Sequence, residues 1–301
     1  MSEETSSGTP AEWDLTGLRE RLTEQLHELA AEEGLDLPEK RLRRQVEEDE
    51  QCKRIIDGWQ AMGGAERVAA WKSLLARTSA VCREPAPKCM RCGECCRRGS
   101  PTLHVQDLEL VRSGALPLGS LMTLRAGEPV SSPFEKKPLR LQSERIKLRE
   151  KPGTSECVFF DSQTELCSKY KSRPWQCRAQ ACWDPALALK LEEQPFLSRR
   201  DVAKEQETLC ELIDEHDRRC SFDKLEQAFA ELEKSKGASI EKLVELVAYE
   251  DHFREFVAQE LGLPAASLHF FFGRGFSELV GLFGFEVEKG PDGSRTLKPI
   301  D

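Results

Sequence analysis

The sequence predicts a mainly α-helical protein in which N- and C-terminal helical regions surround an irregular, metal-organised, cysteine-rich module with a small β-hairpin. Apolar residues recur every three or four positions in both outer regions, which is the period of a helix with one buried face. Seven of the twelve cysteines fall between Cys89 and Cys177, in a stretch dense in Pro, Gly and basic residues. We therefore expect three regions: an acidic helical region at 1–80, a metal-binding module at 81–185 and a helical region at 186–301.

The N-terminal region is predicted to form three helices. Leucines spaced by three and four residues follow one another from Leu15 to Leu29, and Gly34 can end this first helix. A second helical stretch follows Pro38 and is closed by Gly63, and a third, shorter stretch comes after it. Two interpretations are open: a three-helix packing unit, or a coiled coil that binds a protein partner.

Charge is unevenly distributed along the chain. The net charge is −9, and the first 40 residues alone carry eleven acidic against three basic residues. An acidic protein is a poor candidate for general binding to nucleic acid or to anionic membranes, so neither is expected as a partner. The acidic N-terminal helices are instead one candidate surface for a protein partner.

The central cysteines have the spacing of metal ligands. Three thiols at intervals of three, with further thiols downstream, allow successive sulfurs to turn toward one centre, as in zinc sites and iron-sulfur proteins. The predicted ligands are Cys89, Cys92, Cys95, Cys96, Cys157, Cys167, Cys177 and Cys182. The start of the chain is polar and shows no signal peptide or membrane span, so a cytoplasmic location is expected, where thiols serve metal or redox chemistry more often than disulfides.

The module is expected to contain little regular structure. Residues 157–161 and 166–170 are predicted to pair as a hairpin whose strand ends each deliver one cysteine. The long insertion between the two cysteine groups is expected to hold a helix near 104–113 and an extended piece near 139–148.

Helical periodicity returns after Pro185. One helix is expected to carry Val202 to Ile213, Ser221 can cap a second, and a third begins at Ser239 with one buried face that continues to Leu261. The segment 269–285 is rich in Phe and very apolar. Two interpretations are open for it: closure of the core, or a docking surface for another protein.

The module resembles a known family of cysteine-cluster domains. The run C-x-x-C-x-x-C-C, the later Cys157, and the stretch from Cys167 to Arg178 look like the CxxCxxCC family, described as a zinc- or iron-chelating domain. That family includes YkgJ-type proteins and, with extra segments, flagellin lysine N-methylases. The resemblance covers about residues 88–183 and implies seven ligands together with four other marked positions. The implied ligands are Cys89, Cys92, Cys95, Cys96, Cys157, Cys167 and Cys177, and the other positions are Tyr170, Arg173, Pro174 and Arg178.

Basic residues surround both cysteine groups although the chain is acidic overall. A centre with four thiolates keeps about two negative charges after metal binding, and nearby cations lower thiol pKa values and stabilise such a centre. Lys88 and Arg98 flank the first group, and Lys169 and Lys171 flank the second. The side chains expected to contact the cofactor are Arg91, Arg97, Arg173, Arg178 and Tyr170.

Both a 4Fe-4S cluster and zinc fit four thiolates. The iron-sulfur cluster is favoured, because three cysteines at C-x-x-C-x-x-C plus one remote cysteine is the ferredoxin arrangement. The adjacent Cys95 and Cys96 also fit poorly around a single tetrahedral zinc ion, because neighbouring side chains diverge.

No nucleotide-binding loop, nucleophile elbow or H-E-x-x-H motif is present, so no catalytic residues are assigned. The leading hypothesis is a metal-binding protein whose centre has a structural, redox or metal-handling role. The alternatives are a cluster-dependent enzyme similar to protein lysine N-methylases and a zinc-folded interaction adaptor.

Overall fold

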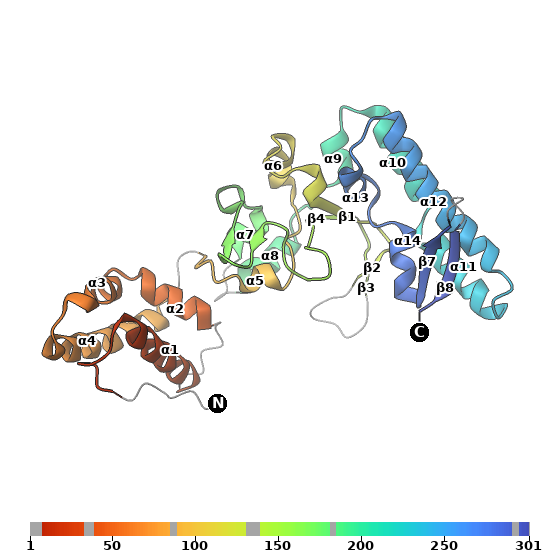
Figure 1. Cartoon of the computed structure of the whole chain (residues 1–301). Helices are drawn as coiled ribbons and strands as arrows, with labels where there is room; N and C mark the ends of the chain where they lie inside the picture. Colours follow the sequence, from red (N-terminus) through yellow and green to blue (C-terminus); the bar gives the residue numbers. More distant parts are fainter. Residues whose placement is uncertain are drawn as a thin grey trace. The chain divides into compact units, whose positions relative to one another are not determined.

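The computed structural model describes residues 8–32, 39–84, 89–130, 139–180, 185–290 and 295–300. Within these residues the chain is mainly helical, and its strands pair only as two-stranded antiparallel sheets, which confirms the predicted fold class (Figure 1). The chain packs as two compact units. Unit 1 comprises Met1–Cys95, Phe160–Ser168 and Ala179–Lys190; unit 2 comprises Cys96–Phe159, Lys169–Arg178 and Leu191–Asp301.

The two units do not follow the three predicted regions. Each unit is built from segments that are separate in the sequence. One boundary between the units falls inside the cysteine module, between Cys95 and Cys96. The division at residues 80 and 185 stays a prediction, because close packing alone does not show which part folds independently.

Four α-helices and a short 3₁₀ turn form the N-terminal part of unit 1. They are α1 (Leu15–Glu32), α2 (Glu39–Glu48), α3 (Glu50–Gly58), η1 (Trp59–Ala61) and α4 (Gly64–Arg83). Their apolar faces meet in one core, which includes Leu18, Leu22, Leu42, Trp59 and Leu74. The leucine stripe of α1 is therefore buried inside the unit, as the packing-unit interpretation requires.

The predicted second helix is two helices. Asp49 interrupts it, because its extended backbone (φ −68°, ψ 130°) and its carboxylate, which accepts the N–H groups of Gln51 and Cys52, make it the N-cap of α3. The guanidinium of Arg77 on α4 holds the same carboxylate at 2.7 Å. Periodicity alone missed the break, since the apolar residues keep nearly the same spacing across it.

The predicted hairpin is present and shorter than expected. Strands β5 (Phe160–Asp161) and β6 (Leu166–Cys167) pair antiparallel in unit 1, with Phe160 opposite Cys167. Cys167 therefore lies in a strand, as predicted. Cys157 does not belong to this hairpin: it forms an isolated bridge with Glu150, and its N–H donates to the carbonyl of Cys96 at 2.8 Å.

The first half of unit 2 contains the predicted helix and extended piece of the insertion. Strand β1, which the sequence analysis did not identify, pairs antiparallel with β4, with Leu121 opposite Leu148. The elements are α5 (Glu94–Arg97, shared with unit 1), η2 (Val105–Asp107), α6 (Leu108–Arg112), η3 (Leu118–Ser120), β1 (Leu121–Leu124), β2 (Pro129–Val130), β3 (Leu139–Arg140), β4 (Arg145–Leu148), η4 (Tyr170–Ser172) and α7 (Trp175–Ala179).

The second half of unit 2 is helical and ends in a hairpin. The expected helix from Val202 to Ile213 is divided in two, whereas the caps predicted at Ser221 and Ser239 lie directly before helices. The elements are α8 (Pro185–Glu192, shared with unit 1), α9 (Arg199–Ala203), α10 (Glu207–Arg219), α11 (Phe222–Lys234), α12 (Ile240–Glu260), η5 (Ala265–Ser267), α13 (Leu268–Phe272), α14 (Phe276–Leu279), η6 (Val280–Phe283), β7 (Phe285–Lys289) and β8 (Arg295–Pro299).

Most of the Phe-rich segment lies in the core of unit 2. Phe270, Phe272 and Phe276 are fully buried, and α13 packs against β1. Helix α12 has the expected buried face, which runs from Leu243 to Val257, but two apolar residues assigned to this face lie outside it. Phe256 is 51% exposed and Leu261 is 39% exposed, because the buried positions include the charged Glu250 and Arg254 instead. No helix in the described part of the chain is both long and apolar enough to cross a membrane.

Candidate metal centre

The C-x-x-C-x-x-C run forms tight turns in unit 1. Arg91 and Gly93 both have left-handed backbone conformations, with φ of 56° and 81°. This geometry directs the N–H of Arg91 toward the sulfur of Cys89, at an N to Sγ distance of 3.4 Å. A backbone N–H that donates to a sulfur fixes the orientation of that side chain, as it does for cysteines that hold a metal.

The second turn repeats this arrangement at Cys92. Burial raises the pKa of the Cys92 thiol, a backbone hydrogen bond from Glu94 lowers it, and the nearby Cys95 and Cys89 raise it further. The sulfur of Cys92 is buried, and the nearest cysteines along the chain, Cys89 and Cys95, both disfavour its charged form. Thiolates are donors that zinc and iron prefer, so the residue types of this turn suit a thiophilic metal.

Helix α2 ties this turn to the hairpin that carries Cys167. Arg44 donates to the carbonyl oxygen of Arg91 and, at 3.4 Å, to that of Met90. The same guanidinium lies 3.5 Å from the carboxylate of Glu165, which also pairs with Lys40. Glu165 is two residues before Cys167, so one arginine connects the two cysteine-bearing segments of unit 1.

Cys95 and Cys96 lie side by side in the single helical turn α5. Consecutive residues of a helix point about 100° apart, so their sulfurs diverge. That the pair fits poorly around a single tetrahedral zinc ion stays a prediction. Within unit 2, the carbonyl of Cys96 accepts the N–H of Cys157, and this bond brings two of the predicted ligand residues together.

Cys177 lies on α7, which is fixed by buried polar contacts inside unit 2. The carboxylate of Asp107 accepts the N–H of Trp175 at 2.7 Å and that of His104 at 3.1 Å. Asp107 is fully buried, and burial raises its pKa despite these bonds. The side-chain oxygen of Gln176 also accepts the N–H of Thr102 at 2.5 Å. The start of α7 is therefore held on both sides.

The predicted cofactor-contacting side chains have protein partners. Arg97 lies 3.7 Å from Glu156, and Arg178 lies 3.9 Å from Asp107. Arg173 stacks on the ring of Tyr170, with its guanidinium carbon 3.8 Å from the ring centre, and donates to the carbonyl of Tyr170 at 2.9 Å. These contacts position the cations near the cysteine segments, and their role toward a metal stays a prediction.

The structure does not assemble the complete predicted ligand set. Within the described ranges, no group of three or more His, Cys, Asp or Glu side chains is arranged to hold a metal ion. Cys182 and Lys88 lie outside the described residues. Cys89, Cys92, Cys95 and Cys167 belong to unit 1, and Cys96, Cys157 and Cys177 belong to unit 2.

The sequence analysis missed two functional features. Arg44 was counted only as part of a helix, although it joins two segments that are 74 positions apart. A cluster of buried charges in unit 2, around Arg125, His216 and Glu250, was missed because its members are scattered singly along the chain. A charged residue inside an apolar helical face, such as Glu250, was the available signal for the second feature.

Comparison with known proteins agrees with the cysteine pattern. No curated protein and no solved structure matches the chain. Residues 88–201 match the model of the CxxCxxCC family, whose description is "Putative zinc- or iron-chelating domain". The match includes all eight predicted ligand cysteines and extends through the start of α9. Residues 88–201 are therefore similar to the CxxCxxCC family, and this similarity covers the part of the chain that holds the predicted ligands.

Proposed function

We propose that the protein binds a metal centre through the thiolates of its CxxCxxCC domain, with Cys89, Cys92 and Cys95 as the core ligands. The paired turns at Cys89 and Cys92 carry this proposal, because each directs a backbone N–H at a sulfur. Such bonds orient the sulfurs toward a bound centre.

Cys167 is the best candidate for the fourth ligand. It packs in the same unit as the three core cysteines, and Arg44 links its hairpin to their turn. In this proposal Cys96 is a neighbour of the centre and not a ligand, because it points away from Cys95 within α5. The remaining cysteines, including Cys182, are left for a second centre or for other roles.

A 4Fe-4S cluster is the proposed centre, and zinc is the alternative. Three closely spaced thiolates plus one remote thiolate match the iron-sulfur arrangement. The cluster would supply one-electron redox chemistry, whereas zinc would stabilise the fold without redox chemistry. Anaerobic purification followed by metal analysis, visible absorption and electron paramagnetic resonance distinguishes them. Brown protein with iron and sulfide supports the cluster, and colourless protein with one equivalent of zinc supports the alternative.

Single substitutions test the ligand set. Cys92→Ser is expected to abolish metal binding, because structural four-thiolate sites gain on the order of 10 kcal/mol from the intact ligand set. Cys167→Ser is expected to have the same effect, and Cys177→Ser to retain the metal. Cys210→Ser is the matched control, since Cys210 lies on α10, donates to the carbonyl of Ala203 and is outside the matched domain.

These substitutions test the three core ligands separately from the fourth ligand. Full metal content in Cys92→Ser would refute the core ligands. Metal loss in Cys177→Ser with retention in Cys167→Ser would leave the core ligands intact and refute Cys167 as the fourth ligand.

A further inference from the structure

Unit 2 contains a cavity of about 380 Å³ whose wall includes two arginines buried in the protein. Arg125 and Arg199 are each 2% exposed, and Phe222 and Ser221 complete the apolar and polar parts of the lining. None of the residues that line it is a proposed ligand of the metal centre. Its most unusual feature is the difference between the two arginines.

Arg199 has acceptors for all its donor groups. Its Nε donates to Glu144 at 2.8 Å, its Nη2 lies 2.6 Å from both Glu144 and Asp217, and its Nη1 donates to the carbonyl of Phe271 at 2.8 Å. The carboxylates of the cavity are therefore already engaged by Arg199. A buried arginine with this arrangement belongs to a structural ion-pair network and has no N–H group left to bind a ligand.

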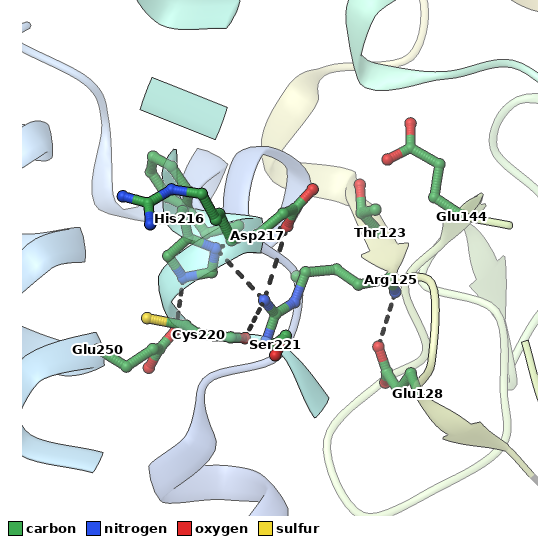
Figure 2. Close-up of polar contacts among 12 residues, drawn as sticks. Thr123, Arg125, Glu128, Glu144, His216, Asp217, Cys220, Ser221 and Glu250 are labelled. Atoms are coloured by element: carbon green, nitrogen blue, oxygen red, sulfur yellow. Dashed lines mark hydrogen bonds and ion pairs between the residues drawn. The ribbon is translucent and has the colours of Figure 1, made fainter. Parts of the chain in front are cut away.

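Only part of the Arg125 guanidinium has hydrogen-bond acceptors. Its Nη1 donates to the carbonyl of Cys220 at 2.8 Å, and it lies 3.4 Å from Nδ1 of His216 and 3.6 Å from Asp217 (Figure 2). Its Nε and Nη2 are buried and have no hydrogen-bond acceptor. These two groups form the side edge of the guanidinium, whose parallel N–H bonds match the two oxygens of a carboxylate or phosphate.

Aromatic rings cover this guanidinium. Its central carbon lies 4.8 Å from the centre of the Phe222 ring and 5.4 Å from that of Phe276. Aromatic faces compensate part of the buried charge, but they do not replace two hydrogen bonds. Phe222 both covers the guanidinium and lines the cavity, as Arg125 itself does, so the arginine and its aromatic cover belong to the same wall.

We propose that this cavity binds a small molecule with an oxyanion group, which pairs with the Nε and Nη2 edge of Arg125. A monocarboxylate fits better than a phosphate, because Asp217 and Glu144 in the same wall penalise a second negative charge. The apolar side of Phe222 favours a ligand with a hydrophobic body. Two near-neighbour arginines thus have different roles: Arg199 holds the wall together, and Arg125 receives the ligand.

The test uses the metal-loaded full chain with selectively ¹⁵N-labelled arginine. Sodium benzoate is titrated at constant ionic strength, and the Arg125 Nε–H resonance is identified by its absence in Arg125→Lys. The proposal requires a saturable shift of this resonance and heat of binding in calorimetry. Inorganic phosphate is expected to bind at least tenfold more weakly, and chloride to give no saturable shift.

Two substitutions are expected to change the affinity for benzoate in opposite directions. Arg125→Lys keeps the charge and removes the planar edge, so benzoate affinity should fall at least tenfold. Asp217→Asn removes a repelling carboxylate, so affinity should rise several-fold. Arg200→Lys is the control, because Arg200 is exposed and pairs with Asp214 outside the cavity. Absence of a saturable shift in the native protein would overturn the proposal.

Two other results would also overturn it. Equal affinity of the native protein and Arg125→Lys would show that the arginine edge does not receive the anion. Phosphate binding as tight as benzoate binding would refute the carboxylate assignment. If Arg125→Lys fails to fold, the heat of benzoate binding to the native protein and the rise in benzoate affinity in Asp217→Asn still decide the question.

Discussion

The cysteine turn (residues 89–95) and the buried charge cluster (Arg125, Glu144, Arg199, His216, Asp217, Glu250 and Arg254) organise the two units in opposite ways. The turn gathers its chemical groups within seven residues, using left-handed backbone at Arg91 and Gly93. The cluster gathers groups separated by up to 129 positions, using the packing of β1, α10 and α12. The first arrangement is local and can be recognised from sequence, whereas the second exists only after unit 2 has folded.

The stability of the two regions is expected to depend on metal in different ways. Repulsion among the sulfurs of the turn is expected to be relieved by an added cation, so its stability should depend on metal. The charges of the cluster compensate one another inside the protein, except at one edge of Arg125, so its stability should depend on each partner being present. Metal removal should therefore change the free energy of unfolding that is lost by a substitution in the cysteine turn, but not the loss caused by a substitution in the cluster.

The largest effect on stability is expected from Glu250→Ala. Glu250 is fully buried and accepts from His216 at 3.0 Å, from Arg254 at 3.1 Å and from the N–H of Phe276 at 3.2 Å. Removing it leaves a buried cation without its main partner, which destabilises by about 3–5 kcal/mol. Urea unfolding of unit 2, followed with and without metal, measures this loss, which should be the same in both conditions.

Glu245→Ala on the same helix is the control. Glu245 is exposed, so its removal should change the free energy of unfolding by less than about 0.5 kcal/mol. An equally small change in the free energy of unfolding for Glu250→Ala would show that the charges of the cluster do not depend on one another for compensation.

The next effect is expected from Gly273→Ala, which disturbs Arg125 without touching a charge. Gly273 has φ 72° and ψ −160°, a conformation open almost only to glycine. An added Cβ would lie 2.8 Å from the carbonyl oxygen of Thr123 and 3.0 Å from Cγ of Arg125. We expect a loss of about 3 kcal/mol, from backbone strain and steric clash together.

Gly262→Ala is the control for a positive φ without a steric clash. Gly262 also has positive φ, 62°, but its Cβ would meet nothing within 4 Å. Strain alone should cost about 1 kcal/mol there. Thermal unfolding of both variants gives the comparison, and equal losses would mean that Gly273 is needed only for its backbone conformation.

The same contrast explains what the sequence could and could not predict. Helical stripes, the hairpin at Cys167 and the domain match followed from local spacing, because each depends on residues within one or two turns. The helix break at Asp49 was missed because Arg77, 28 positions away, helps to hold the cap. Arg125 and the pairing of Glu250 with His216 were missed for the same reason on a larger scale, since their partners lie 91 and 34 positions away along the chain.

A smaller effect is expected from Arg44→Ala, because it removes a support of the cysteine turn and no ligand. Arg44 donates to the carbonyl of Arg91 and pairs with Glu165. A hydrogen bond to a charged group contributes about 1.5–3 kcal/mol, so metal affinity should fall about tenfold or more. Competition with a chelator measures the affinity. Arg43→Ala is the control, since Arg43 is exposed and pairs only with Glu47 one helical turn away among the described contacts.

The smallest effect is a pH dependence assigned to Asp217. Burial would raise the pKa of this carboxyl, but the hydrogen bond with His216 and the charges of Arg199 and Arg125 lower it from 3.8 to about 2. A carboxyl with a lowered pKa in the folded state stabilises the protein above the unfolded value, and this contribution is lost as the pH falls from about 4 toward 2. Because the side chain is 38% exposed, solvent screening reduces the contribution to about 1 kcal/mol.

Comparison of the native protein with Asp217→Asn isolates this contribution. The thiolates of the cysteine turn also bind protons in acid, but they do so in both proteins, so their effect cancels in the difference. The difference in unfolding free energy should be constant above about pH 4 and shrink between pH 4 and 2. A difference that stays constant to pH 2 would mean that Asp217 is not held as a carboxylate by the arginines, and the compensating charges would then have to be sought elsewhere in the cluster.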